Sequence, residues 1–265
     1  MVNYSDYECT DLFKGSWTNS RLIRGEQPLI CSEMNIKLEP KRVLPGYGLY
    51  GVSFDFKGHG HRLIYIGKFQ GEKEKGRFGG NIVTERWRRH LYTISMRGHR
   101  VGCSKSRLRL FNKMTEGAAG ENSFLSLLTQ SQIVQLTARD VGCQASLNRL
   151  LFSYVVREQL SKQVQSEVSD VAKVCGCFKF HYWQVKEQQS DSSALSKPKV
   201  DLKVVEDKII RKYSGSLPVN KEFKWTDQTV NNFNPNDLID LGSTAFTELS
   251  SDIKLSLGKF EALQH

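Results

Sequence analysis

The segment Tyr47-Gly-Leu-Tyr-Gly-Val-Ser-Phe-Asp-Phe56 alternates in polarity, and the apolar segment Arg62-Leu-Ile-Tyr-Ile-Gly67 follows it after the glycine-containing turn Lys57-Gly-His-Gly-His61. Two such strand patterns joined by a short turn are typical of a β-hairpin. Farther along the chain, residues 175–185 are rich in aromatic β-forming side chains and predict a third strand. The central structure is therefore expected to be a small antiparallel sheet.

Helical patterns follow the hairpin. Thr84 is a candidate cap for a helix over residues 85–97, and a second, basic helix is expected at 105–114. Residues 122–165 and 201–213 place apolar side chains three or four positions apart, as amphipathic helices do. Together with the strands, these helices predict an α+β fold in which the small antiparallel sheet is flanked by helices.

The 265 residues allow one large domain or a domain with additions. We expect an N-terminal arm or subdomain at 1–44 and a main domain at 45–221, with a helical insertion at about 120–175. The remainder, 222–265, is acidic and rich in asparagine, which predicts a C-terminal extension that packs peripherally.

The composition is that of an ordinary soluble protein, with 39% hydrophobic and 25% charged residues. No apolar run approaches the roughly 20 residues that cross a bilayer, so no membrane insertion is expected. The chain starts without a signal-peptide pattern, and its six cysteines are interpreted as free thiols in the cytoplasm.

A net charge of +10 favours polyanionic partners, and the excess is concentrated in one segment. Residues 86–115 contain nine lysines and arginines and no acidic residue. A basic run can be a solvated helix face, but interleaved apolar residues such as Trp87 and Leu91 favour a folded phosphate-binding surface. The candidate DNA-contacting residues here are Arg88, Arg89, Arg97, Arg100, Lys105, Arg107 and Arg109.

Several motifs occur in the order found in one nuclease superfamily. Gly48-Leu49-Tyr50 and Tyr65-Ile66-Gly67 resemble the paired tripeptides of the GIY-YIG nucleases, with leucine replacing the central isoleucine of the first. Glu85-Arg-Trp-Arg-Arg-His90 resembles the helix that supplies the family's arginine and histidine. Val204 to Tyr213 resembles the helix with its metal-binding glutamate, and Leu217-Pro-Val-Asn220 resembles its closing turn. The resemblance covers about 45–221 and is strongest to the type II restriction enzymes.

This resemblance implies roles for individual residues in phosphodiester hydrolysis. Tyr50 would be the general base, and Lys68, directly after the second tripeptide, would lower its pKa. Tyr65 would orient the water or the phosphate, and Arg86 would stabilise charge in the transition state. His90 would bind the phosphate, orient Tyr50 or relay a proton; the alternative is a structural, hydrogen-bonded histidine.

The remaining implied residues concern the metal and the local structure. Glu206 would bind one divalent cation, Mg²⁺ or Mn²⁺, whose shell is completed by water and the scissile phosphate. Asn220 is expected to hold the loop geometry or the glutamate. The resemblance further implies double-stranded DNA as substrate, and a homodimer or a DNA-bridged pair for cutting both strands.

The sequence thus predicts a metal-dependent DNA endonuclease, most like a site-specific restriction enzyme acting in anti-phage defence. A homing or repair nuclease of the same superfamily is one alternative. A non-catalytic DNA-binding protein on a nuclease scaffold is another, although such a decayed site would be expected to have lost Tyr50, Arg86 or Glu206. RNA as substrate stays open, because phosphate contacts carry no sequence information.

Overall fold

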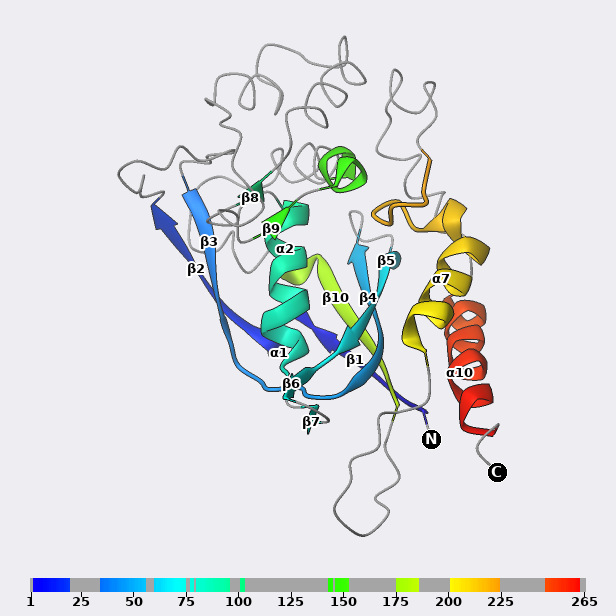
Figure 1. Cartoon of the computed structure of the whole chain (residues 1–265). Helices are drawn as coiled ribbons and strands as arrows, with labels where there is room; N and C mark the ends of the chain where they lie inside the picture. Colours follow the sequence, from blue (N-terminus) through cyan, green and yellow to red (C-terminus); the bar gives the residue numbers. More distant parts are fainter. Residues whose placement is uncertain are drawn as a thin grey trace.

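The structure, a computed structural model, describes most of the expected core of the protein (Figure 1). The described residues are 2–19, 34–55, 60–74, 77–78, 80–95, 101–102, 143–144, 146–152, 175–185, 201–224 and 246–262. The expected basic helix at 105–114 and most of the insertion at 120–175 lie outside them. Within the described residues, no helix is long and apolar enough to cross a membrane.

The main sheet is antiparallel and four-stranded, with the order β1-β10-β4-β5. Its strands are β1 (Val2–Glu8), β10 (Phe178–Val185), β4 (Tyr47–Asp55) and β5 (His61–Gln70). The prediction of an α+β fold with a small antiparallel sheet is confirmed, and β4 and β5 form the expected hairpin. In this hairpin Tyr50 is paired with Gly67, and a β-bulge lies between Val52 and Ser53.

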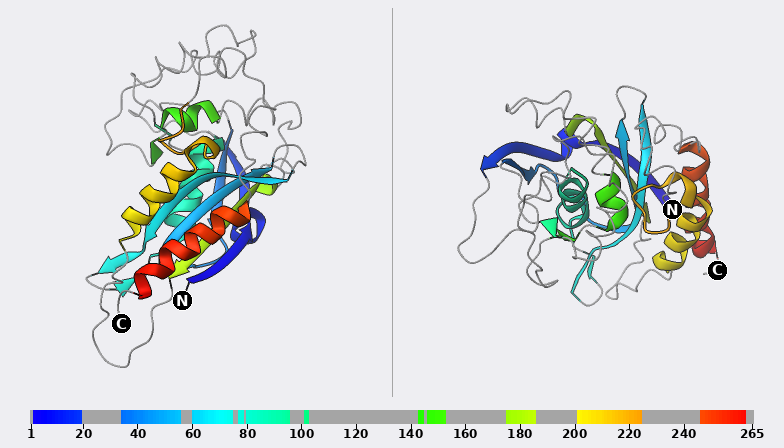
Figure 2. Two further views of the ribbon diagram at one scale, coloured as in Figure 1. Left: turned by 90° about the vertical axis from the view of Figure 1, so that its right-hand side faces the viewer. Right: turned by 90° about the horizontal axis from the view of Figure 1, so that it is seen from above.

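Helices cover both faces of the sheet (Figure 2). One face packs against η1 (Val83–Trp87) and α2 (Arg88–Ser95). The core on this side includes Tyr50, Val52, Phe54 and Phe180 from the sheet and Trp87 and Leu91 from the helices. The other face packs against α7 (Leu202–Lys212) and α10 (Phe246–Ala262) and contains Leu49, Ile66, Trp183, Val205, Ile209 and Ile253. This division follows from the alternation of side chains along a strand.

The first strand of the N-terminal segment belongs to the main sheet. Val2–Glu8 pairs with β10 along its whole length and thereby adds an edge strand to the main sheet. A short helix, α1 (Cys9–Leu12), then leads into β2 (Phe13–Asn19), which pairs with β3 (Met34–Pro40) as a separate ribbon. The sequence of β1 has no strong alternation because both of its faces are only partly buried.

The helix that follows the hairpin begins earlier than expected, and Thr84 is not its cap. Asn81 has this role, because its side-chain oxygen accepts hydrogen bonds from the backbone N–H groups of Val83 and Leu44, both at 3.1 Å. The hydroxyl of Thr84 instead donates to the carbonyl of Asn81. The first turn, η1, is a π-helix, a form that often occurs at functional sites.

The C-terminal residues are less peripheral than expected. Helix α10 lies beside α7 (Figure 1) and buries Leu249, Ile253 and Leu257 in the second core cluster. The indole N–H of Trp183, in β10, donates to the hydroxyl of Ser250 at 2.9 Å. The acidic and asparagine-rich composition of 222–265 is an average that conceals this apolar helix face.

Smaller elements complete the described structure. Helix α7 begins after Asp201, whose carboxylate accepts from two backbone N–H groups of the first turn, and is followed by η2 (Ser214–Ser216). Two short strand pairs are formed by β6 (Glu72–Glu74) with β7 (Arg77–Phe78) and by β8 (Val101–Gly102) with β9 (Cys143–Gln144). Residues 147–152 are helical.

Candidate active site

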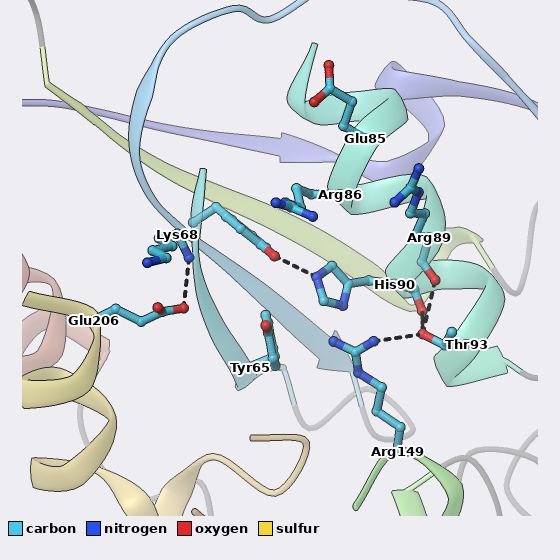
Figure 3. A pocket seen from close by; sticks show the side chains of 10 residues that line it. Tyr65, Lys68, Glu85, Arg86, Arg89, His90, Thr93, Arg149 and Glu206 are labelled. Carbon is cyan, nitrogen blue, oxygen red and sulfur yellow. Dashed lines mark hydrogen bonds between the residues drawn. The ribbon is translucent and has the colours of Figure 1, made fainter. Parts of the chain in front are cut away.

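A cavity of about 370 Å³ lies at β5, the edge strand of the main sheet (Figure 3). Six of the seven residues predicted for catalysis line it, and four further residues join them. The lining residues are Tyr50, Tyr65, Lys68, Glu85, Arg86, Arg89, His90, Thr93, Arg149 and Glu206. They come from β4, β5, η1, α2, the helical residues 147–152 and α7, so the pocket is built from segments far apart in the sequence.

Gly67 allows two tyrosine rings to meet in this pocket. Tyr50 on β4 lies opposite Gly67 on β5, and Tyr65 lies two residues before it, on the same face. A Cβ atom on Gly67 would lie 2.7 Å from the hydroxyl oxygen of Tyr50 and 2.8 Å from a ring carbon of Tyr65. Gly67 is therefore needed because a larger side chain would collide with the two tyrosines, and not because its backbone has an unusual conformation.

The hydroxyl of Tyr50 and Nε2 of His90 are 2.7 Å apart and form a buried hydrogen bond. Burial, followed by the positive charges of Arg149 and Arg86, holds the pKa of His90 well below its usual value. Nε2 of a neutral His90 can accept a hydrogen bond from the Tyr50 hydroxyl, and burial and the neighbouring Tyr65 raise the pKa of Tyr50 well above its usual value. Among the described residues, Nδ1 of His90 has no hydrogen-bond partner that would stabilise an imidazolium.

Lys68 is not placed to lower the pKa of Tyr50, contrary to the expectation from the sequence. It is paired with Leu49, whose side chain faces α7, whereas Tyr50 faces α2. The positive charges that act to lower the pKa of Tyr50 are those of Arg86 and Arg149. Since neighbouring strand residues point to opposite faces, Lys68 acts on Glu206 instead.

Glu206 of α7 reaches the pocket from the other side of β5. Its carboxylate accepts a hydrogen bond from the backbone N–H of Lys68 at 3.0 Å. Burial raises the pKa of Glu206, while the charge and the N–H group of Lys68 act against this rise. The pocket thus wraps around the sheet edge, with His90 on one side of β5 and the Glu206 carboxylate on the other (Figure 3).

Asn220 does not line the pocket; it fixes the strand that carries it. Its side-chain amide accepts from the N–H of Ile66 at 2.9 Å and donates to the carbonyl of the same residue at 2.8 Å. Because β5 is an edge strand, these backbone groups point away from β4 and need other partners. Asn220 supplies them and so holds β5 between Tyr65 and Lys68.

The predicted DNA contacts are only partly described. Arg89 is exposed and lines the pocket, and Arg88 is half-buried in the same turn of α2 without lining it. Arg97, Arg100, Lys105, Arg107 and Arg109 lie outside the described residues. Arg86 is also exposed and lines the pocket, so two arginines of the basic segment contribute positive charge to it.

Three pocket residues were not predicted. Glu85 carries a carboxylate that accepts from the backbone N–H of Asn81 at 2.9 Å, and Thr93 is buried one turn after Arg89. Arg149 comes from the segment 122–165, for which the sequence predicted only amphipathic helices. The i, i+4 spacing of Glu85, Arg89 and Thr93 was a usable signal, whereas no local pattern distinguishes Arg149.

Glu206 is the pocket carboxylate that could hold Mg²⁺ or Mn²⁺. Among the described residues, no group of three or more histidines, cysteines and acids could enclose a metal ion. Mg²⁺, however, keeps several waters and is commonly bound through one or two carboxylates plus substrate phosphates. Glu206 suits this mode, because its half-buried carboxylate lines the pocket and a bound cation would offset the burial that raises its pKa.

The chain was compared with protein-family models, with curated proteins and with solved structures, and no match was found in any of the three.

Proposed function

We propose that the protein is a metal-dependent DNA endonuclease with a GIY-YIG-type core, most like the type II restriction enzymes. The observation that carries this proposal is the convergence of Tyr50, Tyr65, Arg86, His90 and Glu206 in one pocket. These residues belong to the sequence motifs that resemble the superfamily. Structural tyrosines would pack as cross-strand pairs in an apolar core, without arginines and a carboxylate around them.

The Tyr50–His90 hydrogen bond supports a proton relay. Tyr50 alone would not act as a phenolate base, because burial raises its pKa and keeps the hydroxyl protonated, and Lys68 does not face it. As a water oxygen forms its bond to phosphorus, Tyr50 would take the water proton and pass its own hydroxyl proton to Nε2 of His90. The bond between phosphorus and the leaving sugar oxygen would break, and His90 would end the step as an imidazolium. The leaving oxygen would take a proton from solvent water, and His90 would then release its proton to solvent.

Binding of the phosphate makes this relay favourable at His90. Arg86 and Arg149 hold the pKa of the free histidine down. An anionic phosphodiester at the arginines compensates their charge, and a more negative transition state does so further. The basicity of His90 would therefore rise at the stage of the reaction at which it accepts the proton from Tyr50. Tyr65, whose ring centroid lies 4.4 Å from that of His90, orients the imidazole or the water.

Glu206 would hold the metal with water and phosphate oxygens. A bound Mg²⁺ ion supplies charge stabilisation of the phosphoryl group and of the leaving oxygen. Lys68 keeps Glu206 oriented through its backbone N–H group, and its ammonium adds positive charge to the same side of the pocket. Cutting both strands of a duplex requires two such sites, so we propose action as a homodimer or a DNA-bridged pair.

Incubation of the full-length protein with a supercoiled plasmid library tests the reaction. With Mg²⁺ or Mn²⁺ we expect linear products, no cleavage in EDTA, and a recurrent sequence at the sequenced ends. Linear products without a recurrent sequence at their ends would reject the assignment as a restriction enzyme but would still support nuclease activity. Salt-sensitive binding without cleavage in either metal would reject the nuclease and favour a DNA-binding protein.

A further inference from the structure

We infer that Arg149 is a second phosphate-binding arginine of the pocket, supplied by the helical residues 147–152 and acting together with Arg86. This inference rests on the proposed nuclease function and names a catalytic residue beyond the motifs that suggested it. It is carried by the anchoring of the helical residues, by the contacts of the Arg149 guanidinium, and by the charges that surround the Tyr50–His90 pair.

The helical residues that carry Arg149 are built into the core. Leu150 and Phe152 are fully buried, and the Phe152 ring packs edge-on against Phe54 of β4, with ring centroids 5.9 Å apart. The side-chain amide of Asn148 donates to the backbone carbonyls of Asn220 and, at 2.9 Å, Phe223. Arg149 is therefore placed by buried neighbours on both sides and not by a loose loop.

Contacts with Tyr65 and Thr93 help to orient the guanidinium of Arg149 within the pocket. Its Cζ atom lies 5.2 Å from the centroid of the Tyr65 ring, and Nη1 donates to the hydroxyl of Thr93 at 3.4 Å. That hydroxyl donates in turn to the carbonyls of Arg89 and His90. An aromatic face and a hydroxyl acceptor orient a planar guanidinium at little entropic cost.

Arg149 and Arg86 act on the same pair of reacting groups. Figure 3 shows their guanidinium groups on either side of His90, and each of them lowers the pKa of His90 and of Tyr50. Two guanidinium groups beside the general base match the two non-bridging oxygens of a phosphodiester. A lysine-like point charge would not supply this planar, directional set of donors.

The charge of the whole pocket favours the same ligand. Four of its lining residues are cations, Lys68, Arg86, Arg89 and Arg149, and two are carboxylates, Glu85 and Glu206. With His90 neutral, the cavity carries an excess of positive charge in a partly enclosed space. A phosphodiester, which gains negative charge in its transition state, is the ligand class that this excess stabilises.

Single-turnover cleavage of plasmid DNA by Arg149→Gln and Arg149→Lys tests the inference. The matched control is Arg211→Gln, which removes an exposed arginine of α7 outside the pocket. We expect Arg149→Gln to lose about 100-fold in rate, as for removal of one transition-state donor. Arg149→Lys should recover only part of this loss, and the control should cleave at the wild-type rate.

The pH profile separates a role at the reacting groups from a structural one. The described groups that face His90 are Tyr50 from β4, Tyr65 from β5, Arg86 from η1 and Arg149 from residues 147–152. Removing the Arg149 cation lets the pKa of His90 rise, so the acidic limb of the profile should move to higher pH in Arg149→Gln. Arg149→Lys retains the charge and should keep the wild-type limb.

The outcomes distinguish this inference from the proposal on which it rests. If Arg149→Gln cleaves DNA with the same rate and pH profile as the wild type, the role of Arg149 is overturned. The nuclease proposal would be unaffected by this result. A loss of rate that accompanies a lowered unfolding temperature in Arg149→Gln, with a fully active Arg149→Lys of wild-type stability, would also overturn the role of Arg149. A wild-type protein that cleaves no DNA would overturn the nuclease proposal, and the role of Arg149 with it.

Discussion

The hydroxyl of Tyr50 lies 2.7 Å from Nε2 of His90, and this buried hydrogen bond joins the central hairpin to the helix that covers it. Both partners are buried, and both have pKa values displaced in the direction that favours their neutral forms. Both groups are therefore neutral in the free protein, and the proposed relay requires a bound phosphate to raise the basicity of His90 before the proton moves. A simple cross-strand aromatic contact would not include this buried hydrogen bond.

Glu206→Gln should abolish metal-dependent cleavage while the fold is kept. The glutamine oxygen can still accept the hydrogen bond from the N–H of Lys68, but the anionic oxygen that attracts Mg²⁺ is lost. We expect a loss of about 100-fold or more in single-turnover rate, of the order found for single transition-state contacts. Asp207→Asn, a change of the neighbouring acid outside the pocket, is the control and should retain activity. Equal Mg²⁺-dependent rates in both variants would exclude Glu206 as the metal ligand.

Two buried histidines should make the fold sensitive to mild acid. Burial lowers the pKa of His181 to about 3, and that of His90 is also lowered, so unfolding lets both bind protons below pH 6.5. Stability is therefore complete above this pH and falls as the pH drops toward 3. His181 alone should cost about 2 kcal/mol of unfolding free energy at pH 5 relative to pH 7. Urea unfolding at several pH values measures this loss, and a flat profile from pH 7 to 5 would contradict the burial of both neutral imidazoles.

Gly67→Ala should impair cleavage more than folding. The new methyl group would lie within 2.8 Å of both the Tyr50 and Tyr65 side chains and would displace one or both from the pocket. We expect a destabilisation of about 1–3 kcal/mol, typical of overpacking, and a much larger relative loss of rate. Gly176→Ala is the matched control, since no atom lies within 4 Å of the added carbon. If Gly67→Ala cleaves like the control, the close approach of the two rings is not needed for the reaction.

The C-terminal helix should contribute directly to stability. Ile253 of α10 is fully buried against the sheet, so Ile253→Ala should cost about 2–5 kcal/mol in urea unfolding. Leu255 lies on the same helix but is 60% exposed, and Leu255→Ala should change the unfolding free energy by no more than about 0.5 kcal/mol. Similar small effects for both substitutions would restore the expectation of a peripheral extension.

The local parts of the fold and site could be predicted from the sequence. The hairpin and α7 have clear periodicities, and the positions of Tyr50, Arg86 and Glu206 in recurring motifs predicted that they would meet. Other features depend on which segments pack together. The place of β1 in the main sheet was not visible, because an edge strand that is half-buried on both faces has no clean alternation.

Tertiary placement also explains the errors within the site. Lys68 follows the second tripeptide directly, yet strand alternation turns it to the face of Glu206 and away from Tyr50. Arg149 reaches the pocket because Asn148 and buried neighbours fix its helix against the core. The position of Lys68 relative to Tyr50 depends on the register of the hairpin, and the place of Arg149 depends on which segments pack together, so local spacing alone fixes neither.

Tyr50→Phe tests the central claim most directly, because it removes one oxygen atom from the pair with His90. The measurement is the single-turnover rate of plasmid cleavage in Mg²⁺, with urea unfolding of the same variant to follow its fold. The proton relay predicts a loss of at least about 100-fold in rate, with a cost of about 1–3 kcal/mol for the unpaired histidine. A folded Tyr50→Phe protein that cleaves DNA at the wild-type rate would contradict the assignment of this pocket as the hydrolytic site.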